Sequence, residues 1–381
     1  MQFLSETDFT RLASYRASPA VSIFIPTHRA GVEVNELQDA QLFKSLLQET
    51  RAALEKNGMS PTEATLLSRR GTELLDSSDF WRDQLDGLGV FMGENFFFTL
   101  KIPEKVREKV FIGPHFYIVP LFPLLRSKPF FLLVLSKGNA RFFKGDRFGL
   151  EEVEVQGLPN GMDDVIRYEE KGGQETFRRA GNKEKATFHG HGPGLADEEE
   201  YVGMYLKEID RTLLGEVLAR ENAPLLLAGP ERLISQYRDG SRYPHLAKQH
   251  ISGNYEHEPA HVFFEKACAA LEPYFSLDAE HALESFYNQS ATPRSTTDPF
   301  KVLPGCFQGK IADLFIRDDL HIRGEFNPET GQVHFKENAS METDCLVNQG
   351  AVQAYLTNGN VHVLRAEKMP EGSKVAALMR W

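Results

Sequence analysis

Cysteine is scarce in this sequence. The 381 residues include three cysteines, Cys268, Cys306 and Cys345, which lie far apart in the chain. No two of them have the spacing of zinc ligands, so neither a zinc framework nor a set of disulfides is predicted. We expect reduced thiols, most of them buried.

Long apolar runs are also missing. The longest unbroken one, Phe130–Leu135, is far shorter than the roughly 20 residues that a bilayer requires. The first residues, MQFLSETDF, lack the basic and then apolar layout of a signal peptide. We therefore expect a cytoplasmic protein with no membrane partner.

Positive charge is in deficit, because the formal net charge is −11. Such a balance argues against broad, non-specific binding of nucleic acid, which needs a basic face. One local exception lies between Arg167 and Lys185, where six basic residues stand against four acidic ones. This segment contains the tripeptide Gly172-Gly173-Gln174.

Hydrophobic residues make up 41% and charged residues 25% of the chain, which is typical of globular proteins. The chain is longer than a single hydrophobic core usually supports, so two or three domains are expected.

Residues 1–126 are predicted to form an N-terminal α/β domain. Asn35 is the predicted N-cap of its main helix, with Gln38 in the capping-box position. The expected elements are strands at 21–25, 88–92, 95–102 and 109–113 and a helix at 36–56.

The middle block, residues 127–276, begins with an apolar run and two alternating segments that predict a three-stranded antiparallel meander. An irregular stretch, 157–196, follows and contains the tripeptide. The remaining pattern completes the order β-β-β-α-β-α-β-α, which is that of a ribonuclease H-like fold with a mixed sheet and helices on both faces. The expected elements are strands at 129–136, 140–146, 150–156, 224–230 and 250–252 and helices at 197–220, 231–238 and 259–275.

The last block, residues 277–381, is predicted to be a small α/β sandwich. A helix opens it, three strands follow, and a second helix ends before Asn358-Gly359-Asn360, which is a good helix stop. Two further strands close the chain. The expected elements are helices at 279–287 and 342–357 and strands at 310–316, 321–326, 332–336, 361–365 and 374–380.

The tripeptide between a meander and a long helix, flanked by α/β domains, resembles the archaeo-eukaryotic peptide-chain release factor and Pelota family. The phrases SIFIPTHR, FFKGDRFGLEEVEV and ATFHGHGPG are similar to its bacterial branch. The resemblance covers nearly the whole chain. It implies that the last block matches the family's third domain, which is similar to kink-turn-binding ribosomal proteins.

In the family's release factors the tripeptide loop enters the peptidyl transferase centre and promotes hydrolysis of the ester between peptide and tRNA. The resemblance therefore implies catalytic roles for Gly172, Gly173 and Gln174. Glycines allow a close backbone approach to RNA, and a neutral amide positions water and donates to an oxyanion. The basic residues implied to contact RNA phosphates are Lys171, Arg178, Arg179, Lys183 and Lys185.

The codon-reading NIKS motif of the family's first domain is absent, which favours rescue of stalled ribosomes over termination. The expected partner is the ribosome or tRNA, and no cofactor is expected. A non-catalytic RNA- or protein-binding relative on the same scaffold is the alternative, and an unrelated small-molecule hydrolase is a third. Whether the chain is an enzyme, and its oligomeric state, are left open.

Thr27, His28 and Arg29 follow the first strand, where α/β proteins often bind ligands. A ligand contact and a purely structural turn are both consistent with that position. A metal nuclease is not expected, since PFFLLVLS contains no carboxylate. Asp146 and Glu151 are expected on the surface. No metal site is predicted, because His189 and His191 have no third ligand at a suitable spacing.

Overall fold

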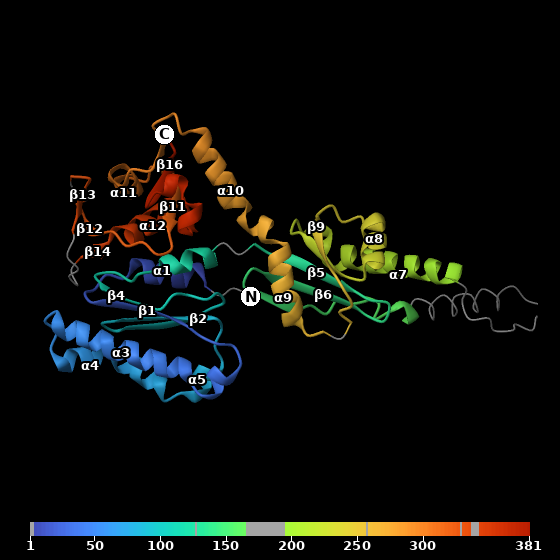
Figure 1. Cartoon of the computed structure of the whole chain (residues 1–381), viewed down its shortest axis with the longest axis horizontal. Helices are drawn as coiled ribbons and strands as arrows, with labels where there is room; N and C mark the ends of the chain where they lie inside the picture. Colours follow the sequence, from blue (N-terminus) through green and yellow to red (C-terminus); the bar gives the residue numbers. More distant parts are fainter. Residues whose placement is uncertain (1–3, 126–127, 165–194, 257, 328–329, 337–342) are drawn as a thin grey trace, which may run out of the picture. The chain divides into compact units, whose positions relative to one another are not determined.

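The computed structural model describes residues 4–125, 128–164, 195–256, 258–327, 330–336 and 343–381. The protein is a mixed α/β structure with several sheets (Figure 1). Its contacts group into two compact units, Lys128–Ser276 on its own and Gln2–Ser127 together with Leu277–Trp381. The separation of residues 1–126 from 277–381 as two domains stays a prediction. None of the described helices combines the length and apolar character that a bilayer crossing demands.

The N-terminal part is a four-stranded antiparallel sheet in the order β3-β2-β1-β4, covered by helices. Phe43 and Leu47 of α3 pack with Trp81 against the sheet residues Ile23 and Val90. The elements are α1 (Glu6–Ser14), β1 (Ala20–Pro26), α2 (Val32–Asn35), α3 (Gln38–Lys56), α4 (Pro61–Leu75), α5 (Ser78–Arg82), β2 (Gly87–Gly93), β3 (Phe96–Ile102), β4 (Lys109–Gly113) and the 3₁₀ turn η1 (Val119–Leu125).

The predicted N-cap of α3 is wrong. Asn35 ends the short helix α2, and Leu37 is the residue that precedes α3. Leu37 has a φ of 53°, in the left-handed region. A helix cannot continue through this conformation, so α2 and α3 are separate helices. The pattern of apolar residues gave no sign of this break, because a leucine seldom adopts that conformation.

The middle unit contains a five-stranded mixed sheet in the order β7-β6-β5-β8-β9. Strands β5, β8 and β9 are parallel, whereas β6 is antiparallel to both β5 and β7. The elements are β5 (Phe130–Leu135), β6 (Ala140–Asp146), β7 (Gly149–Glu152), α7 (Leu195–Glu216), the 3₁₀ turn η2 (Leu218–Arg220), β8 (Leu225–Gly229), α8 (Glu231–Gly240), β9 (Leu246–Ser252) and α9 (Ala260–Ala270). Helix α10 (Glu272–Asn288) begins in this unit and ends in the other.

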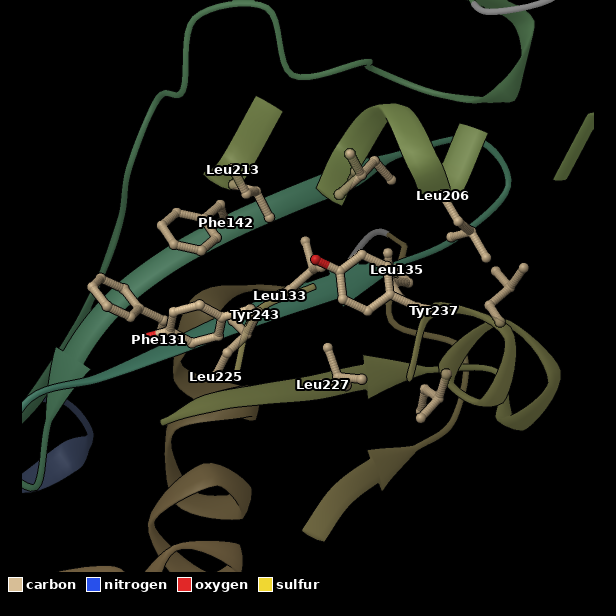
Figure 2. Close-up of a cluster of buried hydrophobic side chains, with 14 of the residues drawn as sticks. Phe131, Leu133, Leu135, Phe142, Leu206, Leu213, Leu225, Leu227, Tyr237 and Tyr243 are labelled. Atoms are coloured by element: carbon tan, nitrogen blue, oxygen red, sulfur yellow. The ribbon is translucent and has the colours of Figure 1, made fainter. Parts of the chain in front are cut away.

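Helices cover both faces of this sheet. On one face α7 and α8 contribute Leu206, Leu213 and Tyr237, which pack against the strand residues Leu133 and Leu227 (Figure 2). On the other face α9 packs through its buried apolar side chains. Strand β5 is buried on both faces, which explains why all of its residues are apolar.

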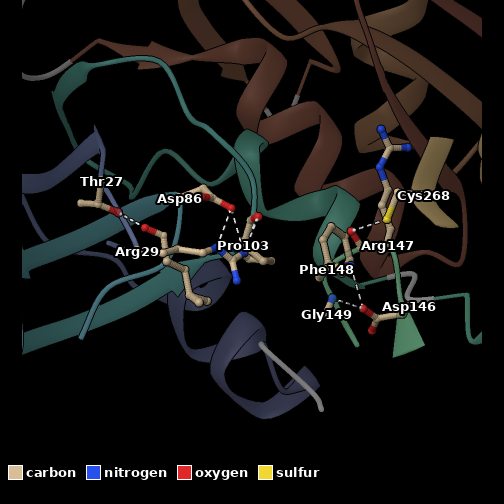
Figure 3. Close-up of polar contacts among 10 residues, drawn as sticks. Thr27, Arg29, Asp86, Pro103, Asp146, Arg147, Phe148, Gly149 and Cys268 are labelled. Carbon is tan, nitrogen blue, oxygen red and sulfur yellow. Dashed lines mark hydrogen bonds and ion pairs between the residues drawn. The ribbon is translucent and has the colours of Figure 1, made fainter. Parts of the chain in front are cut away.

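Asp146 is buried, so its expected position on the surface is wrong. Only 7% of the residue is exposed. Its Oδ1 accepts hydrogen bonds from the backbone N–H groups of Phe148 at 2.7 Å and Gly149 at 3.1 Å (Figure 3). The carboxylate therefore caps the turn between β6 and β7. Glu151 is exposed, as expected.

The C-terminal part has a mixed sheet in the order β10-β16-β11-β15 and a small sheet in the order β13-β12-β14. Helices α11 and α12 carry buried apolar residues that contribute to its core. The elements are β10 (Ser295–Thr296), α11 (Pro299–Phe307), β11 (Ile311–Arg317), β12 (Arg323–Asn327), β13 (Gln332–Phe335), β14 (Asp344–Cys345), α12 (Leu346–Leu356), β15 (Asn360–Leu364), the 3₁₀ turns η3 (Ala366–Lys368) and η4 (Pro370–Gly372), and β16 (Val375–Met379).

Candidate functional site

The candidate site is the edge of the middle sheet where its parallel strands end, here called the carboxyl edge. Ser136 follows β5, Pro230 follows β8, and Asn254 lies two residues after β9. All three residues line one hollow of about 330 Å³. In open α/β sheets such an edge is the usual place for a ligand.

The chain that leads toward residue 165 is fastened to this edge through backbone contacts. The Met162 N–H donates to the carbonyl oxygen of Lys137 at 2.8 Å. Gly161 is buried, and a Cβ placed on it would lie 2.6 Å from the carbonyl oxygen of Gly138. Glycine is required at 161 because any side chain would collide with that backbone.

The chain returns to the same edge along α7. Val202 of this helix lines the hollow together with Ser136 and Leu233. Glu199, one turn earlier, forms an ion pair with Arg232 of α8. The described residues on both sides of 165–194 are therefore held at the carboxyl edge.

The buried Tyr205 hydroxyl has no hydrogen-bond partner within the described part of the chain. Burial raises its pKa well above the ordinary value, and the charges of Glu256 and Asp164 raise it further. Tyr205 is therefore a neutral phenol at physiological pH. Glu256, which lines the hollow, is thus one of the charges that act on this hydroxyl.

Glu231 links the end of β9 to the start of α8. One carboxylate oxygen accepts from the Ser252 hydroxyl and lies 3.1 Å from His250 Nε2. The Ser252 hydrogen bond, followed by the one with His250, lowers the Glu231 pKa. These contacts fix the first turn of α8, whose N-cap, Pro230, offers no side-chain cap.

A larger hollow of about 1010 Å³ lies along α7, between that helix and the segment 157–164. Its charged lining is mixed, with Lys207 and Arg242 near Glu208 and Asp210. Asp210 is buried and accepts from the Ser241 hydroxyl at 2.7 Å. Arg242 Nε donates to the same carboxylate at 3.2 Å. Asp210 thus fixes the turn after α8 to α7.

The predicted catalytic and RNA-contacting residues lie outside the described residues, so their roles stay predictions. They are Gly172, Gly173, Gln174, Lys171, Arg178, Arg179, Lys183 and Lys185. His189 and His191 fall in the same segment. Among the described residues, no group of three or more His, Cys, Asp or Glu side chains is arranged to hold a metal ion.

Thr27, His28 and Arg29 are each engaged within their own part of the chain. The buried Thr27 hydroxyl donates to the Leu85 carbonyl at 2.8 Å, and Arg29 contacts Asp86 Oδ2 through Nε at 2.9 Å and Nη2 at 2.8 Å (Figure 3). His28 Nδ1 lies 2.7 Å from Asp39 Oδ1. These contacts hold the turn after β1. A ligand contact by these residues stays a prediction.

Gln236, Arg232 and Asn254 were not singled out by the sequence, yet they line the smaller hollow. Two of them are in α8, directly after a buried strand. The rule that ligands bind beyond the carboxyl ends of parallel strands would have drawn attention to that position. The same rule applies to Asn254, because the predicted strand 250–252 ends at the residue where β9 ends.

Residues 130–273 match the model of bacterial archaeo-eukaryotic release factor family 7. The match confirms the resemblance of the chain to this bacterial branch. It covers most of the middle unit and includes the tripeptide at 172–174. A search of the curated proteins finds no match.

Solved structures with a distant likeness include the archaeal translation termination factor aRF1, which is 16% identical. That match covers 98% of this chain and 96% of the other, with a TM-score of 0.24. Pelota of Archaeoglobus fulgidus is 14% identical over 77% of this chain and 79% of its own, with a TM-score of 0.36. Dom34 of S. cerevisiae, a translation termination-like factor, is 11% identical over the same shares, with a TM-score of 0.32.

Proposed function

We propose that this protein is a release-factor-like translation factor that associates with the ribosome or tRNA. The observation that carries the proposal is the family match over residues 130–273, which contains Gly172-Gly173-Gln174. The proposed role is rescue of stalled ribosomes, because no codon-reading NIKS string is present. A cytoplasmic location follows from that role.

The proposed reaction is hydrolysis of peptidyl-tRNA. One water adds its oxygen to the ester carbonyl carbon, the bond to the ribose 3′ oxygen breaks, and that oxygen takes up a proton. Gln174 cannot act as a strong base, so its contribution is to position the water and to stabilise the oxyanion. The basic residues Lys171, Arg178, Arg179, Lys183 and Lys185 bind RNA phosphates.

The anchoring at the carboxyl edge supports this reaction. A catalytic segment must be presented from a rigid base to hold its geometry. Gly161 and Met162 contact the turn at Lys137 and Gly138, while Val202 of α7 reaches the same edge. Both flanks of the proposed catalytic segment therefore have a fixed support.

We also propose three domains, with residues 127–276 in a ribonuclease H-like fold. The strand order β7-β6-β5-β8-β9 and the helices on both faces support that fold. The last domain, residues 277–381, is proposed to match the kink-turn-binding ribosomal proteins, and its mixed sheet with α11 and α12 is consistent with this.

A peptidyl-tRNA release assay on ribosome complexes tests the reaction. Gln174→Ala is expected to lower the release rate at least tenfold while co-sedimentation with ribosomes is kept. Gln156→Ala is the matched control, since Gln156 is an exposed residue of the same unit. Equal release rates for Gln174→Ala and wild type would leave the non-catalytic alternative. Failure to co-sediment with ribosomes would contradict the wider proposal.

A further inference from the structure

The smaller hollow at the carboxyl edge is a ligand site that the proposed hydrolysis does not use. Its volume of about 330 Å³ lies at the lower end of the range for small-molecule sites, about 300–1,000 Å³. It has room for one small planar ligand and excludes a nucleic-acid duplex.

The chain topology explains why the hollow forms there. The connection leaving β8 enters α8, which packs on one face of the sheet, whereas the connection leaving β9 enters α9 on the opposite face. Where successive connections turn to opposite faces, a crevice opens beyond the strand ends. Pro230 and Asn254, which line the hollow, belong to these two connections.

The lining combines an apolar wall with neutral hydrogen-bonding groups. Val202 and Leu233 are buried apolar side chains, and Gln236 and Asn254 carry carboxamides. A carboxamide presents an acceptor and two donors in one plane, which is the arrangement that recognises the edge of a nucleobase. Apolar side chains suit the faces of the same base.

Gln236 is the decisive residue. Its Oε1 is withdrawn from solvent and has no hydrogen-bond partner among the described residues. Buried acceptors in proteins are nearly always paired. Gln236 lines the wall of the hollow, so a rotation of its carboxamide would turn this acceptor toward a donor on a bound ligand.

Two cationic side chains in the lining are suited to bind the phosphate group of a nucleotide. Lys137 and Arg232 line the hollow and are both exposed. Arg232 forms an ion pair with Glu199 in which both side chains are largely exposed, so a phosphate can replace the carboxylate at small cost. The start of α8 lies beside them without a side-chain cap, and its positive end adds to the attraction.

Other ligand classes fit less well. Glu256 is the one carboxylate in the described lining, which is too few for a dedicated cation site. A purely apolar ligand would leave the carboxamides and cations unmatched. We propose that this hollow binds a single unpaired nucleotide, with its base against Val202 and Leu233 and its edge hydrogen-bonded to Gln236. The proposal does not depend on catalysis by Gln174.

The nucleotide has two sources, a free mononucleotide or the unpaired end of an RNA. Calorimetric titration of the full chain with AMP, adenosine and the trinucleotide 5′-CCA-3′ separates them. We expect saturable AMP binding with a Kd below about 1 mM. Binding of the trinucleotide at least tenfold tighter than AMP would assign the site to an RNA end, and equal affinities would assign it to a free nucleotide.

Variants locate the binding. Gln236→Leu keeps the size of the side chain and is expected to weaken AMP binding about tenfold. Gln353→Leu, at a half-buried helical glutamine of the other unit, should leave it unchanged. Arg232→Gln should reduce the preference for AMP over adenosine. Thermal unfolding checks that each variant is folded. The proposal is overturned if neither AMP nor the trinucleotide saturates, or if AMP binds Gln236→Leu and Arg232→Gln as it binds wild type.

Discussion

His321 Nδ1 lies 3.4 Å from the Cys345 thiol. The histidine ring also packs against two aromatic rings of the N-terminal part, stacking on Phe111 with centroids 5.8 Å apart and tilting against Tyr117 at 4.7 Å. The imidazole is therefore enclosed mainly by groups that solvate a charge poorly. Within this unit, the N- and C-terminal parts meet around a histidine that favours its neutral form.

The first prediction concerns acid stability. Burial lowers the pKa of His321 to about 4, and the charges of Lys109 and Arg323 add to the effect. An unfolded histidine titrates near 6.5, so the unfolded state binds more protons between these values. The contribution of His321 to stability is full above pH 6.5 and is lost as the pH falls toward 4. We expect a loss of about 1–2 kcal/mol after allowance for partial exposure.

Urea unfolding of wild type and His321→Gln at pH 4.5, 5.5 and 7.5 measures this effect. The variant should show a shallower decline toward acid than wild type. His334→Gln is the control, because His334 is exposed on β13. Parallel pH profiles for wild type and His321→Gln would contradict the assignment.

Much of the fold could be predicted from patterns along the chain. Strand β4 was predicted at its observed residues, and β5 and β8 within one residue at each end, since short apolar runs bounded by turn residues are strong signals. Helix α4 was missed although Ser60, Pro61 and Glu63 form a complete capping box with proline in the first turn. That signal was local and could have been read.

Other features could not have been read from the chain. Asp146 is buried because two backbone N–H groups of the next turn point at its carboxylate, and an acidic residue near a strand end is usually solvated. Gln236 lies in the wall of the smaller hollow, which is built from four separate segments of the chain. Spacing along the sequence does not show which distant segments come together in the fold.

The second prediction concerns Asn348, which is fully buried. Its Nδ2 donates to the Phe116 carbonyl at 2.9 Å, and its Oδ1 accepts from the Ile118 N–H at 2.8 Å. Asn348→Leu leaves both backbone groups buried without partners and should lower the free energy of unfolding by about 2–5 kcal/mol. Asn288→Leu, at an exposed helix end, should have an effect of less than about 0.5 kcal/mol in the same urea unfolding measurement. Similar midpoints for the two variants would refute the role of Asn348.

The third prediction compares Asp146 with Glu151, two acidic residues of neighbouring strands. Asp146→Ala removes the cap of the turn between them and should cost about 1–3 kcal/mol of stability. Glu151→Ala alters an exposed side chain and should change stability by less than about 0.5 kcal/mol. Differential scanning calorimetry of both variants measures the difference. A loss for Asp146→Ala as small as that for Glu151→Ala would show that the cap is unimportant.

The fourth prediction concerns Gly161, on which the anchoring of the carboxyl edge depends. Gly161→Ala would place a methyl group 2.6 Å from the Gly138 carbonyl oxygen. Because the contact is with backbone, the segment must shift, and we expect a loss of about 1–3 kcal/mol in thermal unfolding. Gly215→Ala, in α7 with nothing within 4 Å of the added Cβ, should instead be stabilising by about 0.5–1 kcal/mol. If Gly161→Ala were as stable as wild type, the close approach of Gly161 to Gly138 would not be what fastens the chain to this edge.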